Sequence, residues 1–173
     1  MTSKGRSRNT KTTHNNYPTT PGAYHTSISH LINGQAIVTK LSMLPAGVER
    51  FGHATKGSKG MPTIGTISYP KVGVDGFAVY GSQLTPNGNG WLALSTAKLT
   101  SPIQLSGVDF YLAPANLLLV PVTAGPFGYC EVHARLPVSL PVGTTWYTQF
   151  VFKDPAATFG MSASNALEIT VQG

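Results

Sequence analysis

Prolines and glycines interrupt this sequence so often that few uninterrupted stretches of helical length remain. The 173 residues include 13 prolines and 19 glycines. Proline removes a helical hydrogen bond and clashes with the preceding turn, and glycine loses more backbone entropy than other residues. Short apolar runs, about 10 to 18 residues apart, lie between these breaks, a spacing typical of sandwiches and barrels. The sequence therefore predicts an all-β protein, an antiparallel β-sandwich of the jelly-roll or immunoglobulin-like kind.

Strand-like runs can be placed along most of the chain. Near the start, two runs at 23–32 and 35–44 flank Asn33-Gly34. This dipeptide favours positive φ at both turn positions and matches the twist of paired strands, so a β-hairpin is expected over 24–43. The later strand candidates are 64–69, 76–83, 90–96, 108–112, 117–122, 129–136, 144–153 and 165–171.

The run 144–153 is the best candidate for a central strand. Trp146, Phe150 and Phe152 alternate with Tyr147, Gln149 and other residues, so one face is apolar and the other half-apolar. A strand with this pattern is covered on both faces. The predicted core residues are Trp146, Phe150, Phe152 and, from the run 90–96, Trp91.

Positive charge is concentrated in the first third of the chain. The net charge is +6, and residues 1–60 carry eight lysines and arginines with Glu49 as the sole acid, whereas residues 61–173 carry four basic and five acidic residues. Charged residues make up only 10% of the sequence, against about 25% in an ordinary soluble domain. A surface this poor in charge is more usual for subunits of packed assemblies and extracellular modules than for cytosolic enzymes.

Residues 1–22 are expected to form a flexible basic arm. The segment is rich in Ser, Thr, Asn and Gly, and it has too little apolar surface to offset the entropy cost of ordering. Three roles stay open for the arm: contact with nucleic acid or an acidic surface, contact with a neighbouring subunit, or a simple solubilising tail. The residues predicted to make nucleic-acid or acidic-surface contacts are Lys4, Arg6, Arg8 and Lys11 in the arm, with Lys56 and Lys59 in the later loop 52–60.

No arrangement of residues predicts an active site or a bound metal, so no cofactor is expected and the chain is predicted not to be an enzyme. His25 and His30 would point to opposite faces of one strand, and His14, His53 and His133 have no partner at a ligand spacing. No G-x-S-x-G elbow is present.

The remaining polar candidates have plain structural interpretations. Asp154 precedes Pro155 and is expected to close a turn, and Glu131 and Glu168 are expected on solvent faces. The loop 52–60 contains Gly-Ser-Lys but lacks the spacing of a phosphate-binding loop. The only cysteine, Cys130, lies in a strand-like run and is expected to be a buried free thiol.

The chain has no apolar stretch of about 18 residues and no apolar segment after its basic start, so neither a membrane span nor a signal peptide is predicted. The expected location is a virion or a cytoplasmic assembly, or the extracellular space if a leader has been removed.

Three blocks of the sequence are similar to a known family of β-domains. They are VERFGHATKGSKGMPTIG (48–65), VDFYLAPANLLLVPVTAGPFGYCEVHARLPV (108–138) and TTWYTQFVFKDPAATFGMSASNALEITV (144–171). The chain from Val48 onward resembles a C-terminal β-domain found on many uncharacterised secreted proteins of planctomycetes and myxobacteria. The resemblance implies a compact β-sandwich module without a catalytic role. Members commonly carry a cysteine pair, which is missing here near His53-Ala54 and Gly107-Val108.

These observations divide the chain into an arm (1–22), a β-hairpin extension (23–47) and a β-sandwich domain (48–173). The expected function is that of a structural subunit of a repeating assembly, such as a virus or phage coat or decoration protein, whose partners are copies of itself and, through the arm, nucleic acid. The alternative is a secreted or cell-surface binding or adhesion module with a shallow ligand surface on loops 84–90 and 124–128.

Overall fold

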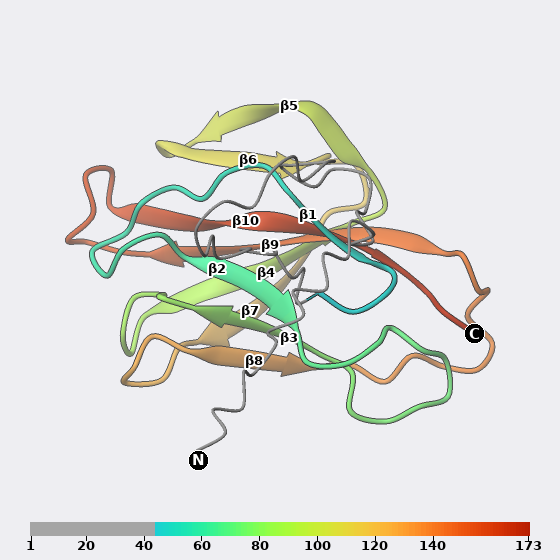
Figure 1. Cartoon of the computed structure of the whole chain (residues 1–173). Helices are drawn as coiled ribbons and strands as arrows, with labels where there is room; N and C mark the ends of the chain where they lie inside the picture. Colours follow the sequence, from blue (N-terminus) through green and yellow to red (C-terminus); the bar gives the residue numbers. More distant parts are fainter. Residues whose placement is uncertain (1–43) are drawn as a thin grey trace, which may run out of the picture. The chain divides into compact units, whose positions relative to one another are not determined.

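The computed structural model describes residues 44–173, which form ten strands and no helix (Figure 1). The predicted all-β fold is confirmed. The arm 1–22, the hairpin 24–43 and the arm residues Lys4, Arg6, Arg8 and Lys11 lie outside the described residues. The strands are β1 (Val48–Phe51), β2 (Thr63–Thr66), β3 (Ala78–Ser82), β4 (Asn89–Ser95), β5 (Lys98–Leu105), β6 (Val108–Leu112), β7 (Leu118–Thr123), β8 (Cys130–His133), β9 (Thr145–Lys153) and β10 (Met161–Thr170).

The strands form three antiparallel layers. A five-stranded sheet has the order β1-β10-β9-β4-β7, a three-stranded sheet has the order β2-β3-β8, and β5 pairs with β6 as a hairpin. In Figure 1 the hairpin lies at the top and β8 at the bottom, with β10 and β9 between them. The described part of the chain is therefore a β-sandwich with a hairpin covering part of the outer face of its larger sheet.

Two separate apolar clusters fill the space between these layers. The larger joins the five-stranded and three-stranded sheets and includes the fully buried side chains of Ile64, Leu92, Phe150 and Phe152. The smaller lies between the five-stranded sheet and the β5–β6 hairpin and includes Val151. Deleting a buried phenylalanine side chain from such a cluster costs roughly 3 to 5 kcal/mol.

Strand β9 is the central strand that the sequence predicts. It pairs with β10 on one side and with β4 on the other. Phe150 and Phe152 are fully buried, and Trp146 is partly buried against the same cluster, with its ring edge-on to Phe77. The predicted core positions on this strand are therefore confirmed.

Trp91 was predicted to be a core residue, and that prediction is wrong. Its side chain is only partly buried and belongs to neither apolar cluster, whereas the next residue, Leu92, is fully buried. Successive side chains of a strand point to opposite faces. Leu92 takes the face toward the three-stranded sheet, so Trp91 must take the outer face.

The sequence did not predict strands β1 and β5, because neither has a run of alternating apolar residues. β1 is four residues long, lies at an edge of the five-stranded sheet, and contains Glu49 and Arg50. β5 is exposed along almost its whole length, and its pairing with β6 is irregular between Lys98 and Ile103. Strand β10 also begins at Met161, earlier than the predicted 165, because a β-bulge between Ala163 and Ala166 lets the strand continue.

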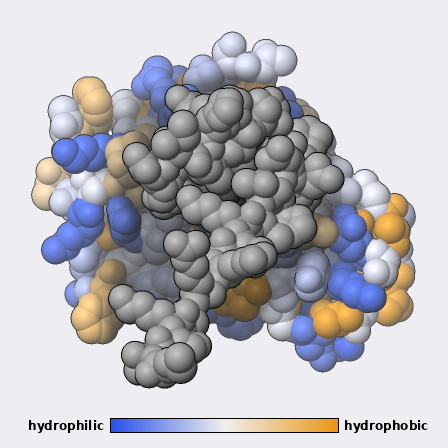
Figure 2. All heavy atoms as spheres, in the orientation of Figure 1, coloured by the Kyte–Doolittle hydropathy of each residue, from blue (hydrophilic) through white to orange (hydrophobic). Residues whose placement is uncertain are grey.

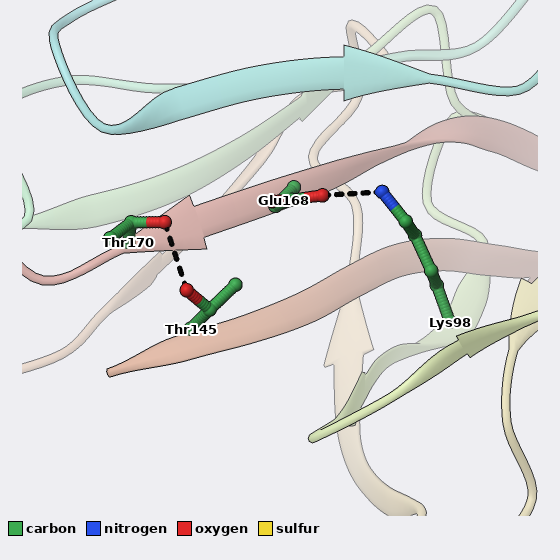
Figure 3. Close-up of polar contacts among 4 residues, drawn as sticks. All are labelled: Lys98, Thr145, Glu168 and Thr170. Atoms are coloured by element: carbon green, nitrogen blue, oxygen red, sulfur yellow. Dashed lines mark hydrogen bonds and ion pairs between the residues drawn. The ribbon is translucent and has the colours of Figure 1, made fainter. Parts of the chain in front are cut away.

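The hairpin is tied to the sheet by polar contacts as well as by apolar packing. Lys98 Nζ in β5 lies 2.5 Å from Glu168 Oε2 in β10, as Figure 3 shows. The same ammonium group lies 5.1 Å from the ring centroid of Phe51 and 5.3 Å from that of Tyr147. The hydrogen bond to Glu168 raises the pKa of Lys98 above its usual value. Further along, the hydroxyls of Thr145 and Thr170 join β9 to β10 at 3.0 Å (Figure 3).

Candidate interaction surfaces

An apolar surface lies at the end of the sandwich where β9 begins. It consists of Ile67, Tyr69, Val74, Val138 and Val142, and is called the apolar end below. These five residues are between 47% and 81% exposed, Val74 the least and Val138 the most. Figure 2 shows hydrophobic residues gathered, with hydrophilic ones among them, at the right of the molecule.

Backbone hydrogen bonds hold the segments of the apolar end together. Gly73 N donates to Leu136 O, Val72 N donates to Gln172 O, and Gly143 N donates to Val171 O. A shallow groove lies at this end, between Gly73 and the segment 135–138. Two of the charges nearby pair with each other, since Arg135 Nε lies 3.2 Å from Asp75 Oδ1. The end is therefore a largely apolar surface on a hydrogen-bonded frame.

The glycine-rich loop lies at the opposite end, where β9 finishes. Gly57 and Gly60 exchange two backbone hydrogen bonds that close a tight turn. Lys56 and Lys59 are exposed on this loop. The residues after it lead into strand β2 at Thr63, so the loop does not precede a helix whose N-terminus could bind a phosphate.

Asp154 holds this loop in place. Its carboxylate is 1% exposed, and Oδ2 accepts hydrogen bonds from Ser58 N (2.7 Å) and Ser58 Oγ (3.0 Å). Burial alone would raise the pKa of Asp154, but these hydrogen bonds and those from neighbouring groups outweigh it and lower the pKa below 3.8. The predicted turn-closing residue thus anchors a loop that is distant in sequence.

The predicted ligand loops 84–90 and 124–128 lie against each other at this second end. Leu84 N donates to Gly128 O, and Asn87 N donates to Gly125 O. Phe127 at the tip is 93% exposed. The hydrogen bonds make the two loops one connected surface.

A shallow groove on the outer face of the five-stranded sheet was not predicted. It has a volume of ≈ 250 Å³ and is lined by Asn89, Gly90, Trp91, Pro121, Val122, Thr123 and Lys153; it is called the Trp91 groove below. Lys153 Nζ lies 5.7 Å from the centroid of the Trp91 ring. No local pattern in the sequence joins these residues, because the pairing of β4 with β7 and β9 brings them together.

The histidines and acidic residues of the described segment do not converge. Within residues 44–173, no three His, Cys, Asp or Glu side chains lie close enough to share a metal ion. His53 is exposed, and His133 Nε2 pairs with Glu131 Oε1 at 2.8 Å on the surface of β8. Glu131 also accepts a hydrogen bond from the hydroxyl of Tyr129 at 2.9 Å. Glu168 lies on the hairpin face, where it binds Lys98.

Cys130 is a free thiol in the larger apolar cluster. Burial raises the pKa of the thiol to about 11. The thiolate is the reactive form of cysteine. The raised pKa therefore keeps the Cys130 thiol protonated and weakly nucleophilic at neutral pH.

The described residues contain no helix long and apolar enough to cross a lipid bilayer. Comparison of the chain with protein-family models, with curated proteins and with solved structures gave no match. The fold and these surfaces are therefore the basis for inferring function.

Proposed function

We propose that this protein is a non-enzymatic structural subunit of a repeating assembly, a coat or decoration protein of a virus or phage particle. Copies pack through the apolar end, and the basic arm contacts neighbouring subunits or nucleic acid. The observation that carries the proposal is the exposure of five large apolar side chains at the apolar end, from Ile67 to Val142. Exposed apolar patches of this kind mark surfaces that other molecules cover.

Charge placement supports the same function. Residues 1–43 contain five lysines and arginines and no acidic residue, whereas residues 44–173 contain seven basic and six acidic residues. A nearly neutral body can approach other copies without strong electrostatic repulsion, and a separate polycation can neutralise phosphates.

The proposal is tested by measuring the mass of the purified full chain over a range of concentrations with light scattering, followed by electron microscopy. The expected result is concentration-dependent oligomers or particles. The substitution Val138→Asp places a charge within the apolar end and is expected to shift the mass toward the monomer.

Phe127→Asp is the control, because it likewise replaces an apolar side chain by a carboxylate, at a position that is even more exposed but lies at the other end. It is expected to leave the mass unchanged. A chain that stays monomeric at every concentration, and that behaves identically after removal of residues 1–22, would overturn the proposal and favour a monomeric binding module.

A further inference from the structure

The outer face of the five-stranded sheet is only partly covered. The β5–β6 hairpin packs over Ala93, Val151, Ala163 and Ala166. Trp91, two residues before Ala93, points to the same face but lies beyond this cover. Pro121 lies directly opposite Trp91 in the register with β7. The indole and the proline ring therefore form the apolar floor of the Trp91 groove.

Polar groups border this floor on one side. Thr123 Oγ1 donates to Asn89 Oδ1 at 2.9 Å. This bond directs the carbonyl of Asn89 toward Thr123, and among the hydrogen bonds of residues 44–173 the amide Nδ2 has no partner. A donor is thus available beside an aromatic ring in a groove of ≈ 250 Å³.

The charge beside the groove is positive. Lys153 lies on the rim, exposed and near the Trp91 ring, and in the described segment it forms no ion pair. The adjacent Asp154 is buried and its charge is already compensated by donors from Ser58. That contact brings the loop with Lys56 and Lys59 to the same end of the sandwich, and these lysines are likewise unpaired in residues 44–173.

We propose that the Trp91 groove is a binding site for single-stranded nucleic acid, in which one base stacks on Trp91 in the place that Lys153 Nζ takes over the ring, and the adjacent phosphate binds the displaced Lys153. Single-strand binding sites combine cations that follow the backbone with aromatic side chains that stack bases. Asn89 Nδ2 donates to a base carbonyl, and Lys56 and Lys59 extend the cationic path. The inference rests on the proposed function, because it assigns to the body a second contact for the nucleic acid that the arm attracts.

The test is binding of a fluorescein-labelled twelve-nucleotide oligouridylate to the full chain, followed by fluorescence anisotropy at several salt concentrations. Loss of one base–aromatic stack typically weakens binding by about 5- to 150-fold, so Trp91→Ala is expected to weaken binding at least about fivefold. Trp91→Phe keeps an aromatic ring and is expected to restore most of the affinity. A plot of log affinity against log salt concentration has a negative slope. Lys153→Met is expected to make this slope less steep by about 0.7, the value for one phosphate contact on a single strand.

Tryptophan fluorescence gives a direct signal for stacking. The chain has two tryptophans, so in the variant Trp146→Phe all tryptophan fluorescence comes from Trp91. Addition of the oligonucleotide is expected to quench the fluorescence of Trp91. Tyr129→Ala, which removes an exposed aromatic ring that stacks on Tyr80 of the three-stranded sheet, is the matched control and is expected to leave oligonucleotide affinity unchanged.

Oligonucleotide binding that is the same in wild type and in Trp91→Ala would overturn the inference and leave the arm as the sole contact. Trp91 fluorescence that responds to protein concentration but not to oligonucleotide would also overturn it, because a second copy would then cover the groove. Particle formation by Trp91→Ala, seen by electron microscopy, separates these outcomes from failure of the proposed assembly function.

Discussion

The side chain of Gln149 in β9 binds the backbone of Tyr111 in β6: Gln149 Oε1 accepts a hydrogen bond from Tyr111 N at 3.1 Å. Gln149 is completely buried, and its Nε2 donates to Asp109 O and to Ser164 O. Tyr111 N and Asp109 O lie on the edge of β6 that faces away from β5. One glutamine therefore satisfies the open edge of the hairpin and the bulge of β10 together.

Replacing Gln149 by leucine should destabilise the protein strongly. The change leaves Tyr111 N and two carbonyl oxygens without partners in a buried region, and each unsatisfied polar group costs about 1 to 3 kcal/mol. We expect the free energy of unfolding to fall by roughly 3 kcal/mol, measured by urea denaturation followed by circular dichroism. Gln104→Leu on the exposed hairpin should change it by less than about 0.5 kcal/mol. Equal stabilities for the two variants would contradict this role of Gln149.

Cys130 should resist thiol reagents in the folded protein. Because burial raises the pKa of its thiol to about 11, very little thiolate is present at pH 8. We expect a chromogenic disulfide reagent to react with Cys130 in urea but not in buffer. Rapid reaction in buffer would show that the larger cluster opens easily.

The same thiol should also make stability depend on pH. The pKa of Cys130 is raised in the folded state from an ordinary value of 9.0, so its contribution is fully present below pH 9. It is lost as the pH rises through about 11, because the unfolded thiol ionises first. The free energy of unfolding of the wild type should therefore fall between pH 9 and 11 more steeply than that of Cys130→Ala.

Replacing Asp154 by asparagine should loosen the loop 57–60. A hydrogen bond to a charged group is worth about 1.5 to 3 kcal/mol, so at pH 7 we expect the variant to lose about 2 kcal/mol of stability. Because the folded pKa of Asp154 is lowered, the carboxylate stabilises the fold above pH 3.8 and stops doing so as the pH falls through the folded value. The difference between variant and wild type should therefore shrink in acid.

Hydrogen exchange provides a local measurement of the same contact. The amide of Ser58 should exchange faster in Asp154→Asn than in the wild type. Asp75→Asn, which removes the exposed partner of Arg135, is the control and should cost less than about 1 kcal/mol. An unchanged exchange rate at Ser58 would show that the loop is held by its own turn.

Gly90 in β4 should not tolerate a side chain. A Cβ atom there would lie 2.4 Å from Val151 O and 2.6 Å from the ring of Phe152. Forcing a methyl group into a packed core typically costs about 1 to 3 kcal/mol, and we expect Gly90→Ala to lie at the upper end of this range in urea denaturation. At Gly125 the nearest atom would be Tyr129 O at 3.5 Å, so Gly125→Ala should be nearly neutral.

Strand prediction succeeded where apolar residues alternate strongly and failed where they do not. The predicted strand 144–153 corresponds to β9 (Thr145–Lys153), because the alternating Phe150 and Phe152 indicate a buried face. The exposed β5 has no such face, and its position is decided by pairing with β6 rather than by its own composition. The candidate sites follow the same division: Lys56 and Lys59 stand out in the sequence, whereas the pairing of Lys153 with Trp91 does not.

The sequence by itself determined that this protein is built from strands and turns, that residues 144–153 form the centre of the fold, and that positive charge is concentrated near the start of the chain. These properties depend on local backbone preferences and on composition, which neighbouring residues encode. Only the tertiary structure decided that Trp91 faces outward, that Asp154 holds the loop of Ser58, and that five apolar side chains gather at one end. Each of these depends on which distant strands pair and in which register, and a shift of one residue in a strand would turn every side chain to the opposite face.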